Sequence, residues 1–176
     1  MKKLITGLGM GLALIPLLVH AMEDQLTLKL THIERIKSTE ERGDELYFSI
    51  TEYSTKVHPR HYVVPAFPSH WLSDQLEKVN NIELWTRKLQ EDEAVTVLVS
   101  LIESDAPPWN VDDLIGTVKL KAINHNEQIK TQWQIPNDKY AKKLGGSDNS
   151  FSLTGDGGQY HISLSLSTNQ NVAQSE

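Results

Sequence analysis

Polar and apolar residues alternate along several short segments of this chain, and that period of two restricts the fold more than any other feature. In residues 25–36, Leu26, Leu28 and Leu30 fall on one side and the residues between them on the other. Successive side chains of a strand face opposite ways, so the pattern is typical of a half-buried strand. Clusters of Gly, Pro, Asn, Asp and Ser separate the strand-like segments, which are residues 25–36, 46–53, 94–103, 115–122, 129–135 and 160–167. Many short strands with turn signals between them predict an all-β fold, an antiparallel sandwich or barrel.

Three other stretches carry weaker signals. Residues 69–89 combine helical spacing of apolar residues with a turn at Asn80-Asn81, which predicts a short helix or irregular segment and then a strand at 82–89. Residues 140–158 are rich in glycine and polar residues and are predicted to form a loop. Residues 169–176 are polar with a single valine and are predicted to be a flexible tail.

The alternation also predicts which side chains fill the core, although the run 95–101 could be buried on both faces. Gly116 stands where a loop turns into a strand, and three explanations are open: a positive φ, a close backbone approach, or an ordinary strand glycine. The predicted core consists of Leu28, Leu30, Phe48, Ile50, Val97, Val99, Leu101, Ile115, Val118, Leu120, Ile162, Leu164 and Leu166.

The N-terminus has the pattern of an export signal. Lys2 and Lys3 precede an uncharged run, residues 4–19, and Val19-His20-Ala21 offers small or modest residues for a signal peptidase. We therefore predict a signal peptide at 1–21, cleavage before Met22, a domain at 22–168 and the tail at 169–176. The alternative, a retained membrane anchor, is disfavoured because the run is short for a span and contains glycines and a proline. The predicted location is the periplasm or the extracellular medium, and no transmembrane segment is expected after cleavage.

Composition excludes several function classes. With 17 basic and 23 acidic residues the formal net charge is −6, which argues against general binding to nucleic acids, because their phosphates require a basic surface. The chain has no cysteine, so disulfides, thiol catalysis and cysteine-ligated zinc are excluded. No nucleophile elbow, phosphate-binding loop or His-Glu-x-x-His motif occurs, and we do not expect an enzyme.

The order of these motifs resembles that of C2 domains. Residues 42–50, Arg-Gly-Asp-Glu-Leu-Tyr-Phe-Ser-Ile, are similar to the acidic loop and second strand of that family, and residues 80–85 resemble its Asn-Pro-x-Trp strand entry. The most specific feature is the strand 98–105 followed by Asp112-Asp113-Leu114-Ile115-Gly116, which looks like the family's acidic loop and Asp-x-Ile-Gly turn. The resemblance runs from about Leu26 to Ser167. It implies an antiparallel eight-stranded β-sandwich with its function on loops at one end.

The resemblance also implies a calcium site on those loops. Calcium takes six to eight oxygen ligands, and carboxylates crowded on adjacent loops repel one another without a cation. The family's first acid would fall near Ser38, which cannot serve, so Glu40 or Glu41 is a displaced substitute. The alternative is that these acids only keep surface loops solvated. The matched residues are Asp44 in the first loop and Glu103, Asp105 and Asp113 in the third, with Asp112 as an extra candidate.

Trp109 lies at the predicted tip of the third loop, in Ala106-Pro107-Pro108-Trp109-Asn110. It could enter a lipid interface, where Trp is favoured, or fold back onto the sandwich. Three functions therefore remain open. The first is an exported C2-like binding module that meets an anionic lipid surface or a protein partner, with calcium as a possible cofactor. The second is a metal-free structural or interaction protein of the bacterial envelope or secretome, and the third is a small hydrolase with an unrecognised site.

Overall fold

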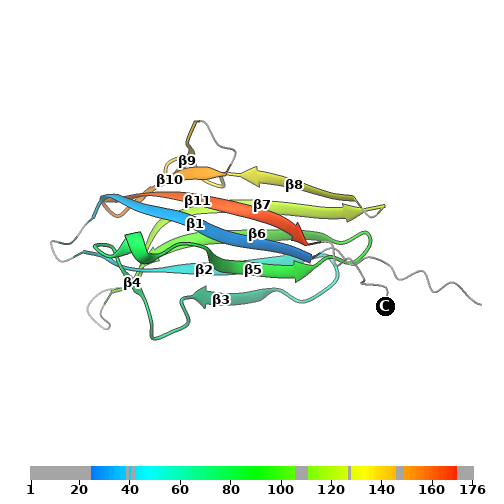
Figure 1. The fold of residues 1–176 in the computed structure, drawn as a ribbon, viewed down its shortest axis with the longest axis horizontal. Helices are drawn as coiled ribbons and strands as arrows, with labels where there is room; N and C mark the ends of the chain where they lie inside the picture. The colour runs from blue at the N-terminus through cyan, green and yellow to red at the C-terminus, as the bar shows by residue number, and fades with distance from the viewer. Residues whose placement is uncertain are drawn as a thin grey trace, which may run out of the picture.

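The computed structural model describes residues 25–38, 40, 43–105, 111–126, 128–145 and 149–169. These residues form two antiparallel sheets, which Figure 1 shows as two layers of long strands. The predicted all-β antiparallel sandwich is confirmed. The predicted signal peptide, Glu41, Trp109 and residues 170–176 of the predicted tail lie outside the described residues. Within the described part of the chain, no helix is long and apolar enough to cross a membrane.

Each sheet is built from strands that pair antiparallel with their neighbours, and β1 pairs with β11, so the first and last described strands lie side by side. The first sheet has the order β5 (Ile82–Lys88), β1 (Gln25–Lys37), β11 (Gly158–Asn169), β10 (Ser150–Gly155) and β9 (Ala141–Lys143). The second has the order β3 (Arg60–Val64), β2 (Glu45–Ser54), β6 (Ala94–Glu103), β7 (Asp113–His125) and β8 (Gln128–Gln134), and β4 (Trp71–Leu72) also pairs with β2.

The strands predicted from alternation are all present, and so is the strand predicted at 82–89. The described residues contain eleven strands, where the C2 resemblance implies eight. The prediction of a loop at 140–158 is wrong, because β10 pairs with β11 and β9 pairs with β10 there. β3 and β4 were not predicted either. The segment from residue 69 contains β4 and a single helical turn, the 3-10 helix η1 (Leu76–Lys78), before β5.

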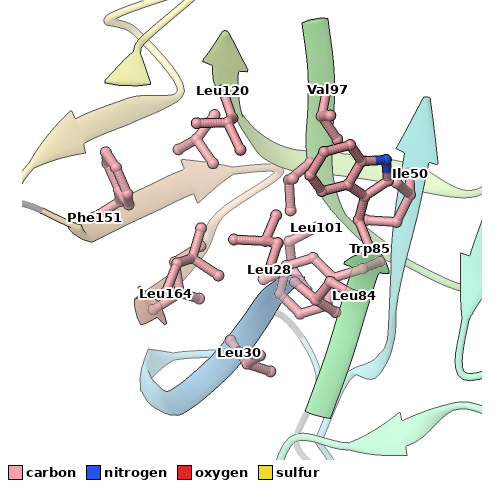
Figure 2. Close-up of a cluster of buried hydrophobic side chains, with 14 of the residues drawn as sticks. Leu28, Leu30, Ile50, Leu84, Trp85, Val97, Leu101, Leu120, Phe151 and Leu164 are labelled. Atoms are coloured by element: carbon pink, nitrogen blue, oxygen red, sulfur yellow. The ribbon is translucent and has the colours of Figure 1, made fainter. Parts of the chain in front are cut away.

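The core lies between the two sheets. Figure 2 shows Leu28 and Leu30 of β1, Trp85 of β5 and Val97 of β6 among the buried side chains that meet there. Each fully buried leucine contributes roughly 1.5–3 kcal/mol by leaving water. All predicted core residues are buried except Leu166, which is half-buried and packs against the core. Along β6 buried residues alternate with half-buried ones, so this strand has one core face and a second, partly covered face.

Gly116 has a steric role. A Cβ atom there would collide with the backbone oxygen of Tyr140 and lie 3.0 Å from the Cβ of Leu153. Ile115 is the extra residue of a bulge in β7, because Leu101 pairs with Gly116 while Ile102 already pairs with Leu114. Of the three explanations that the sequence left open, the close backbone approach is the one the structure supports. β7 thereby packs against β10 at the end where the acidic loop enters the sheet.

A buried ionic network joins the two sheets at the β2–β5 side. The guanidinium of Arg87 on β5 bonds the carboxylates of Glu52 on β2 and Glu93, and both glutamates are fully buried. Trp85 Nε1 donates to Glu52 Oε2 at 2.7 Å. Burial alone would raise the pKa of Glu93, but hydrogen bonds from Ser54 and from the Gln90 amide, with the charge of Arg87, hold that pKa below its ordinary value. The network therefore ties β5 of one sheet to β2 of the other.

Candidate functional site

The predicted ligands gather at one end of the sandwich, which we call the acidic end. It is the end at which β1 leads into β2, β6 into β7 and β10 into β11, on the left of Figure 1. Strand pairing places Glu103, the last residue of β6, opposite Asp113, the first of β7. The described acids of this end include Asp44, Glu103, Asp105, Asp112, Asp113 and Asp156.

Asp44 is a buried structural residue. Its side chain accepts a hydrogen bond from the hydroxyl of Tyr160 on β11 and another, at 3.1 Å, from the amide of Glu40. Its own amide donates to the hydroxyl of Ser73 at 2.8 Å. Burial first, and then the hydrogen bond to Asp44, raise the pKa of Tyr160 well above its ordinary value, with a smaller contribution from the charge of Glu103. Asp44 and Glu103 therefore lie close to the same phenol, and Asp44 ties the β1–β2 connection to β11.

Asp112 has a similar tying role on the other loop. The hydroxyl of Tyr47 on β2 donates to Asp112 Oδ2 at 2.7 Å, and the amide of Asp105 donates to Asp112 Oδ1 at 3.1 Å. Burial, the hydrogen bond to Asp112 and the charge of Asp112 raise the pKa of Tyr47 to about 12. The carboxylate of Asp112 thus joins the β6–β7 loop to β2.

The strongest crowding of acids occurs at Asp113. Its pKa is raised by desolvation, by the negative charges of Asp156 and Asp105, and by hydrogen bonds with those two carboxyl groups. Asp113 and Asp105 flank the β6–β7 loop, whereas Asp156 comes from the β10–β11 turn of the other sheet. The acidic end therefore brings together carboxylates from both sheets, and one proton is held more tightly there than in an isolated aspartate.

Asp156 is a site residue that sequence reasoning missed. It occupies the turn Gly155-Asp156-Gly157-Gly158, with φ +45° at Asp156 and +80° at Gly157. Two consecutive residues with positive φ are typical of a tight type I′ hairpin, for which Asp-Gly is a preferred sequence. The Asp-Gly signal is present in the sequence, but the prediction of a loop over residues 140–158 does not place Asp156 between two strands.

Of Glu40 and Glu41, the two candidates for the first acid of the predicted calcium site, the structure describes Glu40. Glu40 is exposed, and its backbone rather than its side chain contacts Asp44. Among the described residues, none of the predicted ligands belongs to a set of three side chains whose ligand atoms all lie within 4.8 Å; Glu91, Asp92 and His125 form such a set. That set is exposed, and it lies at the opposite end of the sandwich, where β5 leads into β6 and β7 into β8.

A hollow of about 300 Å³ lies beside the acidic β6–β7 loop. Asp105 and Asp112 line it together with Tyr47 and with the proline-rich connection that follows β3. Phe67 of that connection is 89% exposed, and Val111, next to Asp112, is 77% exposed. Phe67 also lines the hollow, so an apolar side chain adjoins its acidic residues. The acidic end therefore offers both charge and apolar contact area.

Comparison with known proteins gives no identity. No family model matches the chain, and no curated protein matches it. The C2 resemblance accordingly stays a hypothesis.

Proposed function

We propose that the protein is an exported, non-catalytic binding module that contacts its partner through the acidic end, in the manner of C2 domains. The observation that carries the proposal is that Asp113 interacts both with Asp105 of its own loop and with Asp156 of the other sheet, beside a hollow that the exposed Phe67 helps to line. The sandwich holds the ends of the strands in place, and the loops that join them can differ in sequence without loss of the fold. Binding residues commonly lie on loops that a rigid scaffold positions in this way. N-terminal sequencing of the mature protein tests the export, and it should begin at or near Met22.

Calcium is the proposed cofactor of this end. Asp113 and its two neighbours offer six carboxylate oxygens, and a divalent cation would remove the repulsion that raises the pKa of Asp113. Because Asp44 is buried and already accepts hydrogen bonds from Tyr160 and from the Glu40 amide, fewer ligands remain than the resemblance implies. We expect weak binding, about 10⁻⁴ to 10⁻³ M, the range of extracellular calcium modules.

The metal also governs which partners are accessible. Without a cation the acidic end repels an anionic lipid surface, so lipid binding requires calcium to bridge the carboxylates and the head groups. Exposed apolar residues at this end, among them Val111 and Leu114, would then enter the interface, and Trp109 in the same loop would join them. A protein partner, in contrast, could bind with or without the metal.

A second candidate function is a metal-free interaction module. Its supporting observation is that Asp44 and Asp112 act as structural ties, since each already accepts hydrogen bonds that hold a loop to a strand. In this case the acids serve to organise the loops and to set the charge of the surface, and no metal is needed for binding.

Calcium titration followed by thermal melting separates the two functions. A cation that binds only the folded protein raises the melting temperature by mass action. The calcium-bound function predicts a rise for the wild type and none for the double variant Asp105→Asn/Asp113→Asn. The matched control is Glu91→Gln/Asp92→Asn at the opposite end, which should keep the full rise. A wild type that does not respond at several millimolar calcium removes the metal from the proposal.

A further inference from the structure

The hollow at the acidic end has a mainly apolar wall with two charged residues in it. Val63, Pro65 and Pro68 line it, and so does the exposed Phe67, which lies between the two prolines in the sequence. Its volume of about 300 Å³ lies at the lower end of the range found for ligand pockets. A space of that size accommodates one or two side chains of a partner rather than a large cofactor.

The charged side chains that line the hollow determine whether it attracts a cationic or an anionic group. Asp105 and Asp112 are its acidic members, and their carboxylates have further acceptor capacity beyond the hydrogen bonds already made. His70 is the basic side chain in the lining, and it lies 3.4 Å from a carboxylate oxygen of Glu45. The crowded carboxylates around Asp113 add to the negative potential. An anionic group is therefore repelled from this hollow, and a cationic group is attracted to it.

We propose that the hollow binds a short segment of a partner protein in which a Lys or Arg stands beside a large apolar side chain. The apolar side chain fills the space between Pro65 and Pro68 and contacts Phe67, and the cation lies at Asp105 and Asp112. This inference rests on the proposed function and specifies the partner for the same end of the molecule. It assigns the acids a direct role in recognition that requires no metal.

Three short synthetic peptides test the proposal, measured by calorimetry or fluorescence anisotropy in the presence of a chelator. The first carries Arg-Trp-Arg at its centre, the second Glu-Trp-Glu and the third Arg-Ala-Arg. We expect the first to bind at least about tenfold more tightly than either of the others. The second peptide lacks the cationic side chains, and the third lacks the large apolar side chain. We also expect its affinity to fall with rising salt, since the charges lie near the surface.

Two variants and one control locate the binding. Phe67→Ser should lower the affinity for the Arg-Trp-Arg peptide about tenfold. Because the side chain of Phe67 is 89% exposed, the fold should be unaffected. Asp105→Asn should weaken the same peptide and reduce the salt dependence. Ile123→Ser, which changes a 48% exposed apolar residue near the opposite end of β7, should bind as the wild type does. The proposal is overturned if all three peptides bind equally or if none binds. It is also overturned if Ile123→Ser weakens binding of the Arg-Trp-Arg peptide as much as Phe67→Ser and Asp105→Asn do.

Vesicles distinguish failure of this inference from failure of the proposed function. The probe is a phosphatidylserine–phosphatidylcholine vesicle with and without calcium. Calcium-dependent binding to the vesicles that Asp105→Asn/Asp113→Asn abolishes, together with no preference among the peptides, contradicts the peptide inference and keeps the acidic end as a lipid-binding site. Absence of both responses contradicts the inference and the proposed function together.

Discussion

The hydroxyl of Tyr160 donates a hydrogen bond to the carboxylate of Asp44 although the two residues are 116 positions apart in the sequence. Both are buried, and they join β11 of one sheet to the connection that leads into β2 of the other. The hydrogen bond fixes the carboxylate of Asp44, just before β2, against β11. The tie therefore links the stability of the sandwich to the geometry of the acidic end.

Replacement of Tyr160 by Phe should destabilise the protein by about 1–3 kcal/mol, because it removes one donor from a buried carboxylate. Denaturant unfolding measures the loss. Tyr53→Phe is the matched control, since Tyr53 is 49% exposed and should tolerate the change. Equal stability of Tyr160→Phe and wild type would contradict the structural role given to Asp44.

The raised pKa of Asp113 predicts a specific pH dependence. The folded protein holds this proton more tightly than the unfolded chain does, so the contribution of Asp113 to stability is present below its ordinary pKa of 3.8 and is lost as the pH rises through the raised value. Asp113→Asn should abolish this pH-dependent loss of stability. The free energy of unfolding of the variant relative to that of the wild type should therefore rise as the pH increases from 3.8 to the raised pKa of Asp113, and it should stay higher at still higher pH. Unfolding curves over a series of pH values measure the difference; a difference independent of pH contradicts the crowding of Asp113 by Asp156 and Asp105.

Removal of Arg87 should be among the most destabilising single changes. Arg87→Met leaves Glu52 and Glu93 buried without their shared cation, which costs about 3–5 kcal/mol in comparable cases. Arg60→Met is the control, since Arg60 bonds the same Glu52 from a side chain that is 52% exposed and should cost less. Chemical denaturation measures the free energy of unfolding of both variants. If Arg60→Met lowers it as much as Arg87→Met does, the central position of Arg87 in the network is contradicted.

Gly116→Val should destabilise the protein by about 1–3 kcal/mol. Any Cβ at this position meets the backbone oxygen of Tyr140, which cannot move without displacing the segment that enters β9. Gly145→Val is the control, because a Cβ there meets nothing within 4 Å. A neutral or stabilising effect of Gly116→Val in thermal melting would show that β7 and β10 do not pack as closely as described.

Much of this fold could be predicted from the sequence because alternation is a local signal. Leu26, Leu28 and Leu30 mark β1 without knowledge of any partner strand. β9 could not be predicted in this way, since its three residues have one buried side chain, Ala141, and owe their conformation to pairing with β10. β3 likewise has no fully buried residue, and its pairing with β2 defines it.

The acidic end was only partly predictable for a related reason. That Asp105 and Asp113 flank one loop follows from the order of the strands, but the position of Asp156 depends on a hairpin that the sequence signal left undetected. Burial of Asp44 under Tyr160 is a long-range contact with no local signature. The same is true of the hollow, because Tyr47, Phe67 and Asp112 come from three separate segments that only the folded chain brings together.

The most direct test of the acidic end as the functional end is the amide NMR spectrum of the wild-type protein during a calcium titration. We predict gradual shifts, saturating in the millimolar range, at Asp105, Val111, Asp113 and Asp156, with smaller effects at Tyr47. The amides of Glu91, Asp92 and His125, at the opposite end, should stay in place. Shifts confined to those three residues, or no shifts at several millimolar calcium, would contradict the assignment of the acidic end as the site of cation binding.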